Sequence, residues 1–366
     1  MKKIQRLFLD FLKFKKSRYL KEIKFWQIKN FPIKKEEAEK NFRNFELESF
    51  FSFLQDLKVI FYSKDPLKIC LDKSRDQWEF LWYFTFLKKR NLIDFKKRKV
   101  IPLQKWLLDY FPRPKNYSEI KKILERKLKV ELKEDLPSNF LFKLKPKGHF
   151  DQLPVSVSSA IFIVEKILEY LPLYKKFLFV GDDDFLSVYL SLAEPRMEIS
   201  VVDIDDETLK AIDNFSKKFN LKIETKKINI EKEKNLKEKF IGFFTAPPNT
   251  FDGVKTFLDF GLRNLSKDGG GVFLSTGDEG MGHTVLFLEK FFAQKNLEIK
   301  EVVPKKIYYP FSEDIKEYQY LLKKMRKFFE EKSIKKAPVL GSSLWIFEYF
   351  PLKIKKMEKK PLYFYY

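Results

Sequence analysis

Histidine, cysteine and long apolar runs are scarce in this sequence of 366 residues, and each shortage excludes a class of protein. Two histidines, His149 and His283, are too few for a multi-histidine zinc site and leave little room for a Ser-His-Asp triad. We therefore expect no metal site, and proton transfer by carboxylates, tyrosine or lysine. The single cysteine, Cys70, cannot form an internal disulfide, which is typical of a reducing cytoplasm.

No apolar run approaches the roughly 18 residues that a membrane-spanning helix needs. The chain starts like a signal peptide, but Asp10 and Lys13 interrupt the apolar stretch, so we expect no export. Ile4 and Phe11 share one face at helical spacing, which favours a helix packed on the body of the protein over one lying on a membrane. These features predict a cytoplasmic protein without a membrane partner.

The chain is strongly basic, with 73 Lys and Arg against 51 Asp and Glu and a net charge of +22. A nucleic-acid partner would explain this charge. The Lys- and Glu-rich composition of a thermophile or an AT-rich genome explains it as well, and we favour that explanation. Nucleic acid as a partner stays an open alternative.

The length allows two domains, and we expect the first over residues 1–135. Helical patterns at Phe45–Leu57 and Asp76–Lys88 precede two short extended runs on either side of a basic turn at 96–98. Helix, helix and a two-stranded wing is the order of a winged-helix module. Such modules bind DNA or serve for packing between proteins, and the sequence leaves both open.

Strands and helices alternate over residues 150–355, which predicts an α/β, Rossmann-like domain of the class I S-adenosylmethionine type. The strands are nearly continuous apolar runs, as expected for a parallel sheet covered on both faces. We expect five parallel strands and a closing antiparallel pair, at 177–180, 199–203, 222–226, 241–245, 271–275, and then 299–309 and 344–350.

Ligands of such sheets bind beyond the carboxyl ends of the strands, and the first strand ends in Gly181-Asp182-Asp183-Asp184. Gly181 permits a tight turn. Three consecutive carboxylates would repel a pyrophosphate and attract a cation. Capping of the next helix would explain one aspartate, but not three.

Polar residues follow the next two strands. Asp203 is placed to accept hydrogen bonds from ribose hydroxyls, and Asn229 to read an adenine amine. Asp205 is expected to serve the start of the following helix. We predict a nucleoside-type sulfonium as the ligand.

Four residues are candidates for binding the second substrate, with an ordinary structural role as the alternative for each. Pro247 and Pro248 fix an extended backbone whose carbonyls, unpaired by their own chain, are available to an amine nucleophile. Asp278 lies in an acidic loop, and the ring of Tyr308 is a candidate for holding an alkylammonium chain.

These motifs together resemble the branched-chain polyamine synthases of thermophiles, also called bis-aminopropyl spermidine synthases. The resemblance covers about residues 145 to 350. It rests on Phe150-Asp151-Gln152, Gly181-Asp182-Asp183-Asp184 with Ser187, Val202-Asp203-Ile204-Asp205, and Pro247-Pro248-x-Thr250 with Gly253, Phe257, Gly261 and Leu265.

The resemblance implies transfer of an aminopropyl group from decarboxylated S-adenosylmethionine, a co-substrate, to the secondary amine of spermidine. The products are branched polyamines and methylthioadenosine. Asp182, Asp183 and Asp184 would be catalytic, and which of them is the base stays open. Gly181, Asp203, Asn229 and Gln152 would hold the donor. The sequence departs from the family's pattern at Ala246 and Asn229, where acids are usual.

Two other functions stay open. One is an S-adenosylmethionine-dependent amine methyltransferase, acting on nucleic acid or elsewhere. The other is a non-catalytic winged-helix regulator that binds DNA. A homodimer is an open alternative to a monomer in each case.

Overall fold

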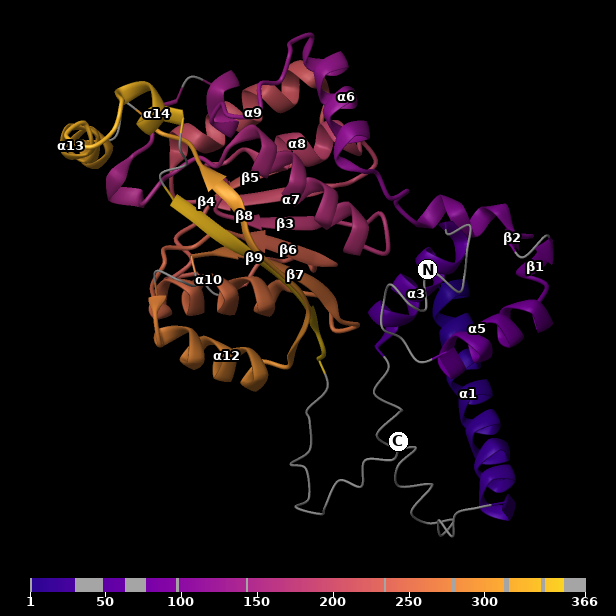
Figure 1. Ribbon diagram of the computed structural model, residues 1–366. Helices are drawn as coiled ribbons and strands as arrows, with labels where there is room; N and C mark the ends of the chain where they lie inside the picture. Colours follow the sequence, from indigo (N-terminus) through magenta and orange to yellow (C-terminus); the bar gives the residue numbers. More distant parts are fainter. Residues whose placement is uncertain are drawn as a thin grey trace.

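The computed structural model shows a sheet domain and a smaller helical module beside it (Figure 1). It describes residues 2–29, 49–62, 77–96, 99–142, 144–233, 235–277, 281–312, 316–336 and 340–351. Within these ranges, no helix combines the length and the apolar character needed to cross a membrane.

Seven strands within the described residues form one sheet in the order β5-β4-β3-β6-β7-β9-β8. The first five of these are parallel, and β9 runs antiparallel to both β7 and β8. This order and the reversed strand confirm the predicted class I Rossmann-like sheet. The strands are β3 (Phe177–Val180), β4 (Ile199–Asp203), β5 (Ile223–Lys227), β6 (Gly242–Thr245), β7 (Gly270–Thr276), β8 (Leu297–Tyr309) and β9 (Leu340–Tyr349).

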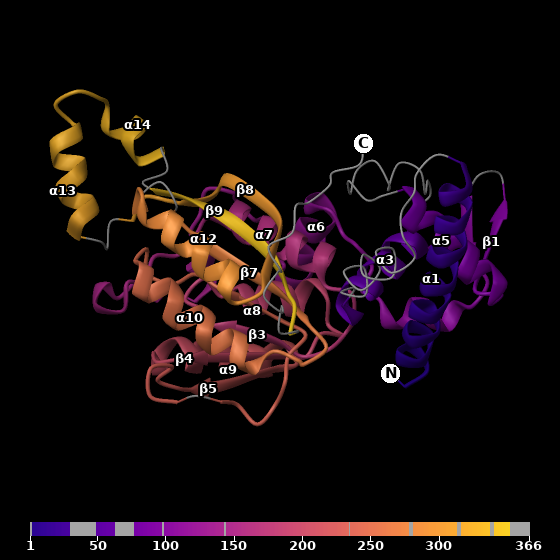
Figure 2. The same ribbon diagram turned by 90° about the horizontal axis from the view of Figure 1, so that it is seen from below.

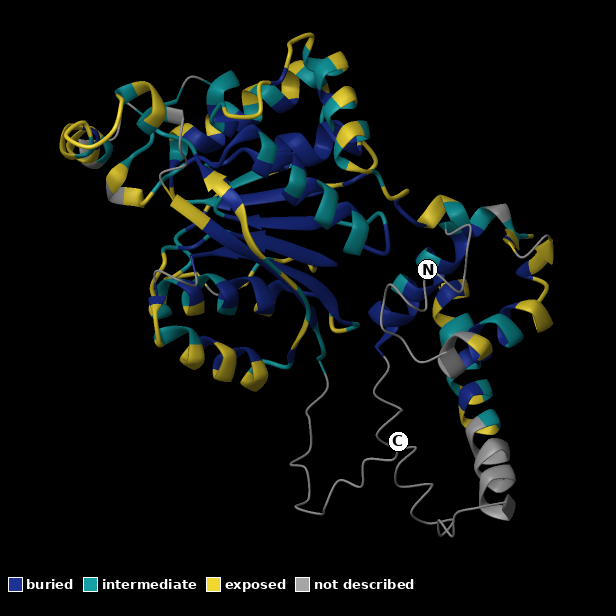
Figure 3. Cartoon of the chain, viewed as in Figure 1, coloured by how far each residue is buried: buried dark blue, intermediate teal, exposed yellow. Residues whose placement is uncertain are grey.

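Helices cover both faces of the sheet, and the central strands β3, β6 and β7 are buried along their whole length (Figure 3). Alternate strand residues enter two separate cores, as the period of a strand requires. One core contains α7 (Val157–Tyr170), α8 (Leu186–Ala193) and α9 (Asp206–Phe219), and the other contains α10 (Phe251–Asn264) and α12 (Thr284–Gln294).

Two helices between β8 and β9 were not expected from the sequence. They are α13 (Lys316–Met325) and α14 (Glu331–Lys336), and they extend away from the sheet (Figures 1 and 2). The predicted closing strands are correct, although β9 begins at Leu340 rather than at 344.

The N-terminal module has helices followed by a hairpin, as predicted. Its elements are α1 (Lys2–Lys29), α3 (Phe50–Tyr62), α5 (Gln77–Lys89), the antiparallel pair β1 (Ile93–Lys96) and β2 (Lys99–Pro102), and a 3-10 helix η1 (Lys105–Tyr110). Ile4 and Phe11 of α1 are fully buried, which confirms that α1 packs on the protein. Residues 45–48 of the first predicted helix lie outside the described residues. The winged-helix assignment stays a prediction.

The segment between the module and the sheet packs on the sheet domain. Helix α6 (Tyr117–Leu128) contacts α7 and α8, with Ile120 and Leu124 fully buried. The 3-10 helices η2 (Ser138–Leu141) and η3 (Gly148–Phe150) follow. The domain limits 1–135 and 150–355 stay a prediction.

The module docks at the amino-terminal edge of the parallel strands through buried charges. The ammonium of Lys58 on α3 donates hydrogen bonds to the carbonyls of Glu169 at 3.0 Å and Leu171 at 2.8 Å, at the end of α7. A cation here satisfies terminal carbonyls and the helix dipole. On β9, the fully buried Glu348 accepts a hydrogen bond from Ser52 at 2.6 Å and pairs with Lys300 at 3.2 Å.

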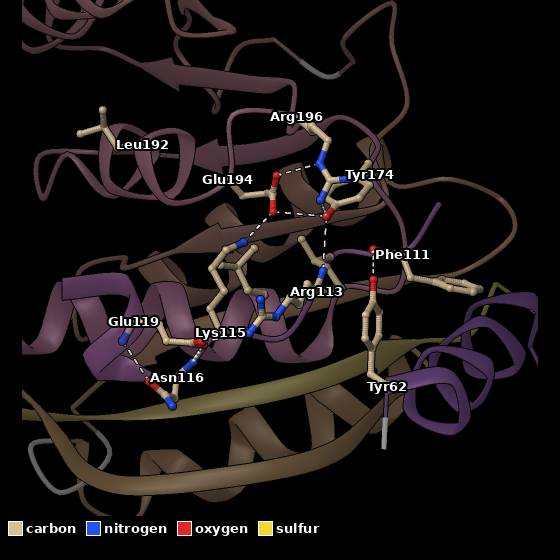
Figure 4. A network of polar contacts seen from close by, with 12 residues as sticks. Tyr62, Phe111, Arg113, Lys115, Asn116, Glu119, Tyr174, Leu192, Glu194 and Arg196 are labelled. Carbon is tan, nitrogen blue, oxygen red and sulfur yellow. Dashed lines mark hydrogen bonds and ion pairs between the residues drawn. The ribbon is translucent and has the colours of Figure 1, made fainter. Parts of the chain in front are cut away.

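A second charged network lies at the same edge, after the last residue of α8 (Figure 4). The buried Glu194 pairs with Lys115 at 2.6 Å and with Arg196 at 3.1 Å, and it accepts a hydrogen bond from Tyr174 at 3.2 Å. Burial by itself would raise the pKa of Glu194, but the hydrogen bonds from Arg196 and Lys115 hold it below its ordinary value. Lys115 thereby fixes the start of α6 to the sheet domain.

Candidate functional site

The carboxyl ends of three central strands lie side by side. Val180 at the end of β3 is in register with Val202 on β4 and with Thr245 on β6. The Thr245 hydroxyl also donates a hydrogen bond to the Val180 carbonyl at 2.8 Å. The segments after these strands, which include Asp182–Asp184, Asp203 and Pro247-Pro248, therefore meet at one edge of the sheet.

The turn after β3 depends on Gly181 and on one of the three aspartates. Gly181 has a φ of +76°, in the left-handed region that favours glycine. The Asp182 carboxylate is buried and accepts a hydrogen bond from the backbone N–H of Ser187 at 3.2 Å, in the first turn of α8. Asp182 therefore stabilises the start of α8, the structural role that the sequence suggests for one of the three aspartates.

Asp183 and Asp184 contact a segment that we call the strap, residues 147–155. The backbone N–H of Leu153 donates to Asp183 Oδ2 at 3.0 Å, and that of Val155 donates to Asp184 Oδ1 at 2.6 Å. These donors are neutral peptide groups. The strap therefore covers the two carboxylates without neutralising them.

Asp203 joins this group at the end of β4. It accepts hydrogen bonds from the backbone N–H of Asp182 at 3.1 Å and of Asp205 at 2.8 Å, one on each carboxylate oxygen. The contact with Asp182 links the two acidic turns directly. Asp203 is half-buried.

Burial raises the pKa of all four carboxyl groups. The pKa values of Asp182 and Asp184 lie well above the ordinary range, and that of Asp203 is also raised. Burial and the charge of Asp203 raise the pKa of Asp183 to about 7. Among the described residues, no lysine or arginine forms an ion pair with any of the four. The edge is therefore a place where a proton or a cationic ligand is stabilised.

Asp205, two residues further on, has the opposite environment. Its side chain caps α9, as expected, by accepting from the Glu207 N–H at 3.1 Å. It also accepts from Lys147 at 2.7 Å and from Gln152 at 2.9 Å. Burial by itself would raise its pKa, but the hydrogen bonds from Lys147, Gln152 and Thr208 lower it to about 2.

Gln152 is held within the strap. Its amide nitrogen donates to Asp205, and its amide oxygen accepts from the Lys147 N–H at 3.1 Å. It lines a shallow, partly open recess that is also lined by Asp183, Phe185 and Asp205. Gln152 thus lies next to the carboxylates, and in this structure it fastens the strap.

Asn229 lies beside Asp203, because the N–H of Ile228 donates to the Asp203 carbonyl at 2.9 Å. Its side-chain oxygen accepts from the N–H of Glu231 at 3.0 Å. The acceptor that the sequence assigned to an adenine amine is therefore used in a local turn here, and its amide nitrogen is the remaining polar group.

One expectation about the two prolines is wrong. The Pro248 carbonyl is paired by its own chain, because it accepts from the N–H of Thr250 at 2.7 Å. Prolines lack an N–H donor of their own, but the tight turn that follows Pro248 supplies one from Thr250. The next residue, Asn249, ties the segment after β6 to the end of β7: its side-chain oxygen accepts from Gly277 N–H at 2.8 Å and from Thr276 Oγ1 at 3.2 Å. Its position directly after Pro-Pro, at the end of a strand, makes it a further candidate at this edge.

The structure does not bring the side chain of Tyr308 to the carboxylates. Successive side chains of a strand point to opposite faces. On β8, Tyr308 is 39% exposed, whereas Tyr309 is buried. Burial and the charge of Asp184 raise the pKa of Tyr309, so Tyr309, rather than Tyr308, lies near the cluster. The charge of Asp184 also acts on the buried Tyr189 of α8. Asp278 lies outside the described residues.

The sheet order, the glycine turn and the acidic residues at the ends of β3 and β4 define the class of the sheet domain. It is a class I Rossmann-like domain of the S-adenosylmethionine type, with an acidic ligand edge. The candidate ligand residues are carboxylates, and within the described residues no group of three or more His, Cys, Asp or Glu is arranged to hold a metal ion.

Comparison with known proteins identifies the family. Residues 141–350 match the family described as the branched-chain polyamine synthase A C-terminal domain. This chain belongs to that family, and the resemblance predicted from the motifs is confirmed.

Two relatives from Methanocaldococcus jannaschii are similar in sequence. One is an uncharacterised protein, 39% identical over 38% of this chain and 36% of its own length. The other is an N(4)-bis(aminopropyl)spermidine synthase, 29% identical over 57% of this chain and 59% of its own length. The matches thus span about one third and three fifths of these relatives.

The solved structure of the branched-chain polyamine synthase from Thermus thermophilus, in complex with N4-aminopropylspermidine and 5'-methylthioadenosine, is also similar. It is 18% identical, with a TM-score of 0.48, over 82% of this chain and 87% of that chain.

Proposed function

We propose that this protein is an aminopropyltransferase. It would transfer the aminopropyl group of decarboxylated S-adenosylmethionine to the secondary amine of spermidine, giving a branched polyamine and methylthioadenosine. The observation that carries the proposal is the cluster of four buried or half-buried carboxylates, Asp182–Asp184 and Asp203, with no cationic side chain paired to it among the described residues. Membership of the polyamine synthase family supports it.

The charges of the two substrates suit this cluster. A decarboxylated sulfonium donor and a polyamine acceptor are both cations, and neither brings a carboxylate or phosphate to the acidic edge. Intact S-adenosylmethionine brings a carboxylate, and a nucleic-acid acceptor brings phosphates, so both would be repelled at close range. The acidic edge therefore favours aminopropyl transfer over methyl transfer.

The reaction needs a base and a precise arrangement of two reactants. The amine nitrogen attacks the donor carbon beside the sulfonium, a C–N bond forms, and the C–S bond breaks with its electron pair moving to sulfur. The attacking nitrogen loses a proton to a carboxylate. Asp183 suits this role best, because a pKa of about 7 lets it accept a proton near neutral pH, and it is less buried than Asp182 and Asp184.

The other residues would position the substrates. We assign Asp203 to the ribose hydroxyls and Gly181 to close backbone approach of the donor. Asn229 would contact the adenine through its amide nitrogen, since its oxygen is engaged with Glu231. The Pro247 carbonyl and Asn249 would form the wall beside the nucleophile, and Gln152 would hold the strap over the donor. Asp278 and Tyr308 remain candidates for polyamine contacts outside this cluster.

A product assay tests the proposal. Purified protein is incubated with spermidine and either decarboxylated or intact S-adenosylmethionine, and mass spectrometry follows the polyamines. We expect a mass gain of one or two aminopropyl groups with the decarboxylated donor only. Asp183→Asn should lower kcat by about 10²-fold or more, the usual contribution of a general base.

The matched control is Asp206→Asn. Asp206 follows the neighbouring strand β4, but its side chain is about half exposed and pairs with Lys210 at 2.7 Å, so its loss should leave turnover within about twofold. Methyl transfer from the intact donor, or equal activity in both variants, would contradict the proposal.

A further inference from the structure

The positive charge of the chain is concentrated outside the sheet domain. Residues 1–110 contain 27 Lys and Arg against 14 Asp and Glu, whereas residues 151–355 contain 32 against 31. A compositional bias of the genome acts on the whole chain, so it does not explain why one part is strongly basic and another nearly neutral. The difference calls for a separate explanation of the N-terminal charge.

Six cationic residues of the N-terminal module form what we call the basic face. They come from α1, from the end of α5 and from the β1–β2 hairpin. All are exposed except the half-buried Arg18: Arg18, Lys88, Lys89, Arg90, Lys96 and Lys99. Figures 1 and 2 show α1, α5 and β1 together on the side of the module away from the sheet.

Contacts between the elements show that this face is continuous. Arg18 and Lys89 lie over the same ring, that of Phe14, at 5.6 and 5.8 Å. Arg90 pairs with Asp10 of α1 at 2.9 Å, which joins the end of α5 to α1.

The hairpin extends the face. Lys88 lies over the ring of Phe95 at 5.7 Å and is 3.7 Å from Asp94. Lys96 and Lys99 face each other in the register of the hairpin. Among the described residues, Asp10 and Asp94 pair with cations of this face, so its six cations keep an excess of positive charge there.

The packing of α1 indicates which polyanion fits. A helix that binds a membrane surface inserts its apolar face between the lipids. The apolar face of α1 is instead used inside the module, with Ile4 and Phe11 fully buried and Phe11 stacked on Tyr83 at 4.2 Å. What α1 and its neighbours present is charge on a rigid support with a projecting hairpin. This geometry suits phosphates spaced along a duplex.

We propose that the basic face binds double-stranded nucleic acid through its phosphate backbone, without sequence preference. The module docks at the amino-terminal edge of the sheet through Lys58 and Glu348, so a duplex bound to the basic face would lie away from the acidic edge. In that position the duplex would not cover the carboxylates and would not compete with them for a cationic substrate. This inference does not depend on the proposed reaction.

The test measures the affinity of the full chain for labelled 20-base-pair duplexes of random sequence, one of DNA and one of RNA, by fluorescence anisotropy between 50 and 200 mM KCl. The variant K88E/K89E/K96E should bind at least about tenfold more weakly at low salt. Its slope of log K against log salt should be smaller by about 2 to 3, because each phosphate contact contributes about 0.9.

The control carries the same change of charge elsewhere. K210E/K217E/K218E alters three exposed lysines of α9 on the sheet domain, and should retain affinity within about threefold. K88Q/K89Q/K96Q replaces the first variant if charge reversal unfolds the module by circular dichroism.

Three outcomes would overturn the proposal. Equal losses in the two charge-reversal variants would mean that only net charge matters. Binding that does not weaken with salt would exclude phosphate contacts. Binding to phosphatidylserine vesicles without binding to either duplex would assign the basic face to a membrane surface. Tighter binding of one of the two duplexes would support the proposal and show whether the ligand is DNA or RNA.

Discussion

Helix α8 has a buried carboxylate at each end, and the two carboxylates have opposite properties. Asp183 lies just before the helix, at the acidic edge of the sheet, and burial with the charge of Asp203 raises its pKa to about 7. Glu194 lies just after the helix, and Arg196 and Lys115 hold its pKa below the ordinary value in spite of burial. The difference lies in the partners: Glu194 has two cations, whereas Asp183 accepts hydrogen bonds from neutral peptide groups.

This comparison separates two uses of a buried charge. A charge that has its counterion within the protein is neutralised on folding and fixes one element to another, as Glu194 fixes the start of α6. A buried carboxylate without a counterion is costly to ionise, and that cost is recovered only when a ligand or a proton supplies the positive charge. Three experiments test this distinction, from the largest expected effect to the smallest.

Removing the cation from the paired end should have the largest effect. Lys115→Met would leave Glu194 buried with one cation fewer, and should lower the free energy of unfolding by about 3 kcal/mol, as for other broken buried pairs. Urea denaturation measures the change. Lys210→Met, which breaks the exposed pair with Asp206, serves as the control and should cost less than about 0.5 kcal/mol. Equal effects would mean that burial does not distinguish the pairs.

Removing the charge from the unpaired end should act in the opposite direction. The native pKa of Asp183 is about 7, against an ordinary value of 3.8, so between about pH 4 and 7 the native state holds a proton that the unfolded chain has released. Ionisation of Asp183 therefore costs stability as pH rises through this window. A shift of this size corresponds to about 4 kcal/mol at pH 8. Because Asp183 is half-buried, solvent screens part of this cost, and Asp183→Asn should be more stable than the wild type by about 2 kcal/mol at pH 8 and equally stable below about pH 4.

The smallest effect should come from supplying the missing cation as a ligand. Spermidine at ten times its dissociation constant should stabilise the wild type by about 1.4 kcal/mol. Differential scanning calorimetry should show a larger gain at pH 8, where the carboxylates are ionised, than at pH 5. The gain should be smaller in Asp183→Asn. Stabilisation of the same size in the variant would place spermidine elsewhere.

The sequence predicted most of the sheet domain, because strands that are buried on both faces have short, nearly continuous apolar sequences between helical patterns. The carboxylates after β3 and β4 could also be predicted to meet, since parallel strands bring their carboxyl ends to one edge. The strap could not be predicted in this way. Its backbone N–H groups at Leu153 and Val155 contact Asp183 and Asp184, and peptide groups leave no signature in a sequence.

The same limit applies to other contacts at this edge. Tyr308 and Tyr309 are adjacent in the sequence, and the register of the strand decides that Tyr309 is the one near the carboxylates. The role of Tyr308 in binding the polyamine stays a prediction. The Pro248 carbonyl is paired through a turn that depends on the conformation of Thr250. Asn249 contacts Gly277 because β7 lies beside β6, a pairing that local sequence does not reveal.

The sequence alone determined the class of the sheet domain, its family and the identity of the acidic residues, because these depend on local patterns along the chain. The tertiary structure decided which charges are paired. Lys115 reaches Glu194 across 79 residues, and Lys58 reaches the carbonyl of Leu171 across 113. Since the pKa of a buried group depends on the atoms that surround it in space, only the folded chain distinguishes a carboxylate that holds the protein together from one that is left to bind a cation.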